Sequence, residues 1–187
     1  MWNNLSWLPQ LNQALSRPDR ARPRLAVVGV GQTLRGDDAA GPLVIHRLRD
    51  LLDADERLCL VDAGHAPENC LGPIVRFQPD YILFVDAIAA EYLPGNILWL
   101  AGEATEETGG GTHTLSLSTL AEYLTAATGA TVGIVGIQPA GLALGDPLSP
   151  AVAAAIEQVA SALAAYWRKA RAASSASSTA EVSVVSA

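Results

Sequence analysis

Two adjacent carboxylates stand where a buried strand is expected to turn into a helix. Residues 25–30 are a short, continuous apolar run rich in valine, which is typical of a strand buried on both faces of a parallel sheet. After Asp37 and Asp38, apolar residues recur at helical spacing as far as Leu52, with the acids at the helix start, where the helix dipole favours them. The first unit of the chain is therefore expected to be a strand, a tight turn and a helix.

The same alternation continues along the chain. Further strands are expected at about 58–62, 81–86, 96–100 and 131–137, with a short additional strand near 73–77. Besides the first helix, over about 38–52, helices are expected at about 116–127 and 149–170. Alternating strands and helices predict an α/β fold.

Length and composition indicate one domain with two decorated ends. The 187 residues are 50% hydrophobic, which is enough to build a sizeable core over residues 24–170. Residues 1–23 are an appended segment in which leucines and tryptophans predict a short amphipathic helix before an Arg/Pro linker. Residues 171–187 are dominated by Ala and Ser and are expected to be a disordered tail.

Charge and targeting signals limit the possible partners. A net charge of −7 with only 12 basic residues argues against nucleic-acid binding, which needs clustered Lys and Arg. No signal peptide or membrane span is recognisable, so a cytoplasmic protein without membrane insertion is expected. Cys59 and Cys70 show neither metal-ligand nor disulfide spacing, and we interpret them as structural residues in a reducing compartment.

A dinucleotide site is the first alternative for a glycine-bearing turn of this kind. The match is poor, because Gly29 and Gly31 are followed by Leu34 where the third glycine of the fingerprint belongs. Asp37 and Asp38 also occupy the helix start that would have to receive a pyrophosphate. The turn is better suited to a cation, or to a reaction that needs carboxylates.

Acidic residues follow three of the expected strands. Asp62, Asp86 and the pair Asp37–Asp38 each come at or after a strand end, and the carboxyl ends of parallel strands share one edge of the sheet. Each aspartate alone more often caps a turn. Their presence on neighbouring strands predicts an acidic functional rim.

The chain has three histidines, and two of them belong near this rim. His65 follows Asp62 in a loop, and His113 comes after a glycine-rich loop at a helix start, whereas His46 within the first helix is interpreted as a surface or interface residue. Two carboxylates and one imidazole are ligands that suit divalent Ni, Zn, Fe or Mn and leave coordination positions open. The spacing matches no self-contained metal motif, so the metal could arrive with a substrate.

These residues resemble a known family, the hydrogenase maturation endopeptidases, which remove a C-terminal peptide from the large subunit of nickel-iron hydrogenases. The likeness extends from about Leu25 to Trp167 and is carried by five blocks in the expected order: residues 29–42, 62–69, 83–87 with Pro94-Gly95, Thr112-His113 with Leu117, and 136–139. The resemblance implies a three-layer α/β sandwich of the phosphorylase/hydrolase-like kind, with about five mostly parallel strands flanked by helices. It also implies a cytoplasmic peptide-bond hydrolase.

The family's site residues transfer to specific positions. The resemblance implies that Asp38, Asp86 and His113 are the catalytic, metal-contacting residues, and that Asp37 is the helix-start residue. Asp62, with the loop through Gly64 and His65, would recognise the precursor. No permanently bound cofactor is expected, because in this family the nickel comes with the large-subunit precursor, which is the implied partner. Whether that nickel acts as a Lewis acid or as a recognition mark is left open.

Some positions depart from the family pattern. Gln32 stands where asparagine is usual, Ala39 where a glycine is common, and His65 where a smaller residue is usual. The Ala-Pro-Glu-Asn run at 66–69 is similar to the branch that processes formate-hydrogenlyase hydrogenases. The alternative hypothesis is a noncatalytic, nickel-sensing chaperone or binding module of the same fold.

Overall fold

The computed structural model describes residues 7–15, 23–101 and 112–182, and it places a five-stranded sheet at the centre of the molecule. The strand order is β2-β1-β3-β5-β4, and only the β4–β5 pairing is antiparallel. The strands are β1 (Leu25–Val30), β2 (Leu58–Gly64), β3 (Tyr81–Ala87), β4 (Ile97–Ala101) and β5 (Thr131–Ile137). The expected mostly parallel sheet is confirmed.

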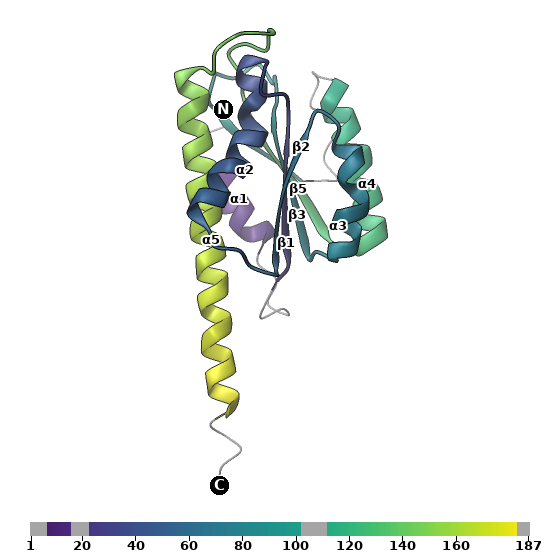
Figure 1. The fold of residues 1–187 in the computed structure, drawn as a ribbon, viewed down its shortest axis with the longest axis vertical. Coiled ribbons are helices and arrows are strands. Elements are labelled where there is room, and N and C mark those ends of the chain that lie inside the picture. Colours follow the sequence, from purple (N-terminus) through teal and green to yellow (C-terminus); the bar gives the residue numbers. More distant parts are fainter. Residues whose placement is uncertain (1–6, 16–22, 102–111, 183–187) are drawn as a thin grey trace.

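Helices cover both faces of the sheet, as Figure 1 shows. One face carries α1 (Trp7–Ala14), α2 (Ala40–Leu51) and α5 (Pro150–Val182). The other face carries α3 (Leu71–Phe77) and α4 (Thr112–Thr128), and two short 3₁₀ turns, η1 (Gly36–Ala39) and η2 (Pro67–Cys70), precede α2 and α3. The molecule is therefore the three-layer α/β sandwich that the family resemblance implied.

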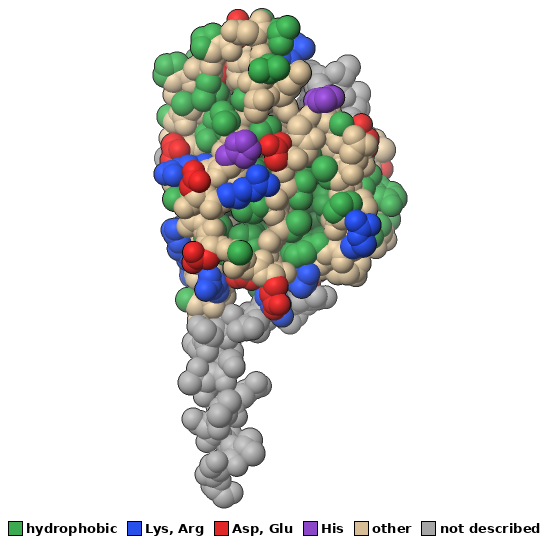
Figure 2. All heavy atoms as spheres, in the orientation of Figure 1, with side chains coloured by type: hydrophobic (Ala, Val, Ile, Leu, Met, Phe, Trp, Pro, Cys, Tyr) green, Lys and Arg blue, Asp and Glu red, His purple; other side chains and the backbone are tan. Residues whose placement is uncertain are grey.

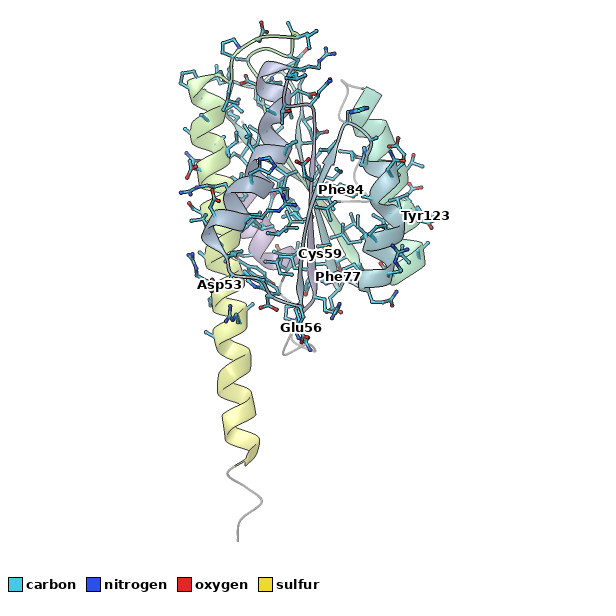
Figure 3. The ribbon with its side chains drawn as sticks, viewed as in Figure 1. Asp53, Glu56, Cys59, Phe77, Phe84 and Tyr123 are labelled. Atoms are coloured by element: carbon cyan, nitrogen blue, oxygen red, sulfur yellow. The ribbon has the colours of Figure 1, made fainter. Side chains whose placement is uncertain are left out.

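The two central strands contribute to both hydrophobic cores. Leu25 and Val27 of β1 pack with α1, α2 and α5, whereas Ala26 and Val28 pack toward α3 and α4. In β3 the even-numbered residues, including Phe84, face α3 and α4 (Figure 3). Because successive side chains alternate between two buried faces, both strands need a continuous apolar run rather than an alternating one.

Helix α2 lies directly against the sheet because two glycines meet there. A Cβ atom on Gly41 would overlap the carbonyl oxygens of Val30 and Val85, and one on Gly29 would overlap the carbonyl oxygen of Gly41. The start of α2 therefore rests on the carboxyl ends of β1 and β3 with no side chain between them. This contact places the turn at 31–39 beside the end of β3.

Two expectations about secondary structure differ from the structure. The short strand expected near 73–77 is instead part of the helix α3, in which Pro73 occupies the first turn and the fully buried Ile74 fills the second core. A disordered tail was expected from Arg171, whereas α5 continues as a helix beyond the body of the domain as far as Val182 (Figure 1). Its Ala-rich sequence has a strong helix propensity. No helix in the described ranges has the length and apolarity needed to span a membrane.

We predict that Gly41→Ala destabilises the fold by roughly 1–3 kcal/mol or more, since its Cβ must displace backbone of β1 or β3. Urea denaturation measures the difference. The matched control is Gly72→Ala in the exposed first turn of α3, where the added Cβ meets only the tip of Arg76 at 3.5 Å. Equal stability of the two variants would contradict the close approach of α2.

Candidate active site

The turn after β1 brings Asp38 back to the sheet. Gly31 has a φ of +135°, and a Cβ there would overlap the carbonyl oxygen of Asp38. The backbone N–H of Gln32 donates to Asp38 Oδ2 at 2.9 Å, which fixes the carboxylate against its own turn. The departure from the family's asparagine at this position therefore leaves the bond intact, because the donor is the backbone.

Asp86, near the end of β3, is a buried carboxyl group whose ionised form is disfavoured by its surroundings. Its side chain is 3% exposed, Oδ1 accepts one hydrogen bond from the N–H of Ala87 at 2.8 Å, and Oδ2 is buried with no hydrogen-bond partner among the described residues. Burial raises the pKa of Asp86 to about 7 against the opposing effect of the Ala87 bond, and the nearby charge of Asp38 adds to the rise. The structure thus brings Asp38 and Asp86 together, as the sequence predicted.

Asp37 has a role that its position at a helix start does not reveal. It is 1% exposed, and its carboxylate accepts backbone N–H bonds from Ala140 at 2.7 Å, Gly141 at 3.4 Å and Ser149 at 2.7 Å. Burial alone would raise the pKa of Asp37, but these donors outweigh it and lower the pKa. Asp37 therefore anchors the loop after β5, and its role is structural.

His113 lies in the first turn of α4, and its side chain is outside the described part of the structure. Helix α4 ends just before β5, whose first residue Thr131 pairs with the first residue of β3, Tyr81. The 17-residue helix is about 25 Å long and the seven-residue strand about 23 Å. The first turn of α4 therefore lies at the carboxyl ends of the strands, on the face of the sheet toward which Asp86 alternates.

Asp62, the remaining aspartate of the predicted rim, lies on the opposite face of the sheet from Asp86. In register, Asp62 aligns with Gly29 and Val85, so it lies on the α2 side of the sheet, whereas Asp86 lies on the α4 side. Its Oδ2 pairs with His46 Nε2 of α2 at 3.1 Å, and its Oδ1 accepts the N–H of Gly64 at 3.1 Å.

The remaining residues of the predicted recognition loop lie beside this pair. Gly64 has a φ of +56° and its carbonyl accepts the N–H of Gly31 at 2.8 Å, and the side chain of His65 is exposed. The structure thus ties this loop to the turn that carries Asp38. Recognition of a partner by Asp62, Gly64 and His65 stays a prediction.

Gln138 is a residue of the site region to which the sequence assigned no role. It is 7% exposed, its Oε1 accepts the N–H groups of Ala90 at 2.8 Å and Tyr92 at 3.2 Å, and its Nε2 donates to the carbonyl of Pro139 at 3.1 Å. It therefore fixes the loop after β3 to the end of β5. A polar side chain directly after a buried strand was the only sequence signal for this.

No three His, Cys, Asp or Glu side chains in the described part of the chain gather as a metal site. The side chain of His113 is outside the described part of the structure. Of the predicted trio, only Asp38 and Asp86 therefore have described side chains. Asp38 and Asp86 offer carboxylate oxygens, the ligand type that divalent cations of this kind accept, and the role of metal ligands stays a prediction for both.

Comparison with known proteins shows what this arrangement is similar to. The sequence profile of the HycI family, described as hydrogenase maturation protease, matches residues 42–165. The Hydrogenase 3 maturation protease of Escherichia coli is 30% identical over 131 residues, which are 70% of this chain and 82% of that protein.

Solved structures agree with the sequence match. The [NiFe] hydrogenase maturation protease HycI from Thermococcus kodakarensis superposes with a TM-score of 0.77 at 30% identity, covering 85% of this chain and 99% of that one. The hydrogenase maturating endopeptidase HybD of E. coli has a TM-score of 0.66 at 27% identity, over 78% of this chain and 93% of that one.

We predict that Asp37→Asn lowers the free energy of unfolding at about pH 7 by roughly 1–3 kcal/mol, because an amide nitrogen replaces an acceptor of buried N–H groups. Since the pKa of Asp37 is lowered in the folded protein, its stabilisation is present above the unfolded pKa near 4 and disappears as the pH falls through the folded value. Urea denaturation at about pH 7 and about pH 3 tests this. A deficit that persists unchanged in acid would contradict it.

Asp86 should act in the opposite direction. Between the unfolded pKa near 4 and the folded pKa of about 7, the folded protein keeps a proton that the unfolded chain has lost, so its stability falls as the pH rises through this interval. Asp86→Asn removes this dependence and should be the more stable protein at about pH 8, by on the order of 1–4 kcal/mol. The exposed Asp53→Asn is the control, and parallel pH profiles for all three proteins would refute the prediction.

Proposed function

Because this chain belongs to the hydrogenase maturation protease family and is a hydrolase of peptide bonds, we propose that it removes the C-terminal peptide from the nickel-loaded precursor of a nickel-iron hydrogenase large subunit. The nickel is part of the substrate. The observation that carries the assignment of the site is the buried Oδ2 of Asp86, which has no hydrogen-bond partner among the described residues and lies near the charge of Asp38.

A buried carboxylate without a partner is costly to the free protein. Desolvation disfavours its charge, and the neighbouring Asp38 disfavours it further. A divalent cation that approaches both carboxylates reverses this balance, since it stabilises both charges and supplies the missing partner of Oδ2. A protein that carries such a cation is therefore favoured over one that lacks it, which supports recognition of the metal-loaded precursor.

His113 completes the proposed set. Its place in the first turn of α4 lies at the same edge and on the same face as Asp86. The thiols of the chain are poor candidates for ligands, because burial raises the pKa of both Cys59 and Cys70. Oxygen and nitrogen groups therefore approach the open side of the precursor's nickel.

Peptide hydrolysis needs a water molecule placed beside the scissile carbonyl. The oxygen of that water bonds to the carbonyl carbon, the carbon–nitrogen bond breaks, and the departing amine takes up a proton. By fixing the nickel, Asp38, Asp86 and His113 hold the adjoining peptide in one position relative to this water. The reaction would take place in the cytoplasm, and no resident cofactor is part of the proposal.

We predict that Asp38→Asn, Asp86→Asn and His113→Ala each reduce processing of the nickel-loaded precursor by roughly 10²-fold or more while the protein stays folded. Intact mass of the precursor over time measures the loss of its C-terminal peptide, and circular dichroism checks the fold. A nickel-free precursor should remain uncleaved by the unmodified protein.

The control is Asp53→Asn, the same exchange of carboxylate for amide at the opposite end of α2 from the site (Figure 3). It should process the precursor at the normal rate. Near-normal processing by the Asp38 or Asp86 variant would refute the site assignment, whereas an intact precursor after incubation with the unmodified protein would refute the function itself.

A further inference from the structure

Three exposed leucines lie on three different loops at the edge of the sheet that carries the candidate site. Leu34 follows β1, Leu93 follows β3 and Leu144 follows β5, and they are 66%, 76% and 72% exposed. All three loops leave the carboxyl ends of parallel strands, the edge that also carries Asp38 and Asp86. Figure 2 shows hydrophobic side chains at this end of the molecule, at the top of the view.

The loops that carry these leucines are bonded to one another. The N–H of Gly145 donates to the carbonyl of Leu34 at 2.9 Å, which joins the loop after β1 to the loop after β5. The loop after β3 is held by Gln138, whose carbonyl accepts the N–H of Gly95 at 2.8 Å, and it closes on itself through the N–H of Asn96 and the carbonyl of Leu93, at 3.0 Å. Backbone hydrogen bonds thus hold together the three loops from which the leucines extend into solvent.

Single exposed leucines are ordinary on protein surfaces, whereas exposed apolar side chains that gather in one region mark interaction sites. Two other large hydrophobic side chains are exposed in the described part of the chain, Leu8 and Tyr123, and both lie on helices. A macromolecule that delivers a peptide to Asp38 and Asp86 approaches the edge of the sheet from which these three loops leave. The occupant of this surface is therefore the same protein that enters the site.

We propose that Leu34, Leu93 and Leu144 form an apolar docking surface for the folded hydrogenase large-subunit precursor, and that they contact apolar side chains around its C-terminal peptide. This inference rests on the proposed function for the identity of the partner. The three leucines decide affinity for the precursor and take no part in bond cleavage. Substituting them should therefore raise KM and leave kcat unchanged.

The test uses the full chain and its cognate nickel-loaded precursor. The three leucines are replaced by glutamine, singly and together, and Tyr123→Gln is the matched control, because Tyr123 is 53% exposed on the outer side of α4 (Figure 3). Cleavage is followed by intact mass over a range of precursor concentrations, and binding of the same precursor is measured directly by biolayer interferometry. Melting temperatures check that each variant is folded.

The triple variant should weaken binding and raise KM by roughly tenfold or more, with kcat retained and the control unchanged. An unchanged KM and unchanged affinity would overturn the docking surface. A dimer of the free protein that the substitutions dissociate, again with unchanged precursor affinity, would assign the leucines to self-association and overturn it too. Binding without cleavage by the unmodified protein would refute the proposed function alone, and the leucine substitutions would still have to weaken that binding.

Discussion

The contact between Gly29 and Gly41 is the constraint on which the rest of the site depends. It lets the start of α2 rest on the backbone of β1 and β3, since a side chain at either position would separate the helix from the sheet. The residues just before the helix, Asp37 and Asp38, are thereby placed beside the end of β3, where Asp86 lies. Nucleotide-binding folds use glycines for a similar approach of helix to strand, but there the helix start receives phosphate. Here the helix start carries two carboxylates, so the same packing produces a site suited to a cation instead of an anion.

The two neighbours Asp37 and Asp38 show how the local surroundings divide one acidic pair. Three backbone N–H groups surround the carboxylate of Asp37, and they hold it ionised in the interior. Asp38 accepts a bond from its own turn and contributes a charge that opposes ionisation of Asp86. One aspartate therefore stabilises the frame of the site, and the other adds to its electrostatic cost. That cost is tolerable if a partner offsets it, which is the usual balance between stability and function at an active site.

Much of the fold was predictable because its signals are local. The apolar run at 25–30 and the alternation of strands with helices identify a parallel sheet without any knowledge of contacts. The segment at 71–77 was not predictable in this way, since its β-branched residues favour a strand while packing of Ile74 into the second core selects a helix.

The acidic rim was predictable from strand ends, but its division was not. Whether Asp62 and Asp86 share a face depends on the register between β2, β1 and β3, and that register puts Asp62 with His46 on the α2 side. Gln138 shows the same limit. Its importance comes from hydrogen bonds to Ala90 and Tyr92, which precede it by 48 and 46 positions in the chain. No local sequence pattern encodes contacts of this separation.

The arrangement separates two kinds of selection that a processing protease needs. In the proposed reaction, the two carboxylates respond to charge, because a cation offsets the cost of ionising Asp86 near Asp38. The exposed leucines respond to shape and apolar area, which a metal ion does not have. A free divalent cation meets the first requirement but gains nothing from the leucines. A nickel-free precursor meets the second requirement but brings no cation to Oδ2 of Asp86, which has no hydrogen-bond partner in the described part of the chain. Under the proposed function only the metal-loaded precursor meets both requirements, and the order of the maturation steps would then rest on two independent terms in the binding free energy.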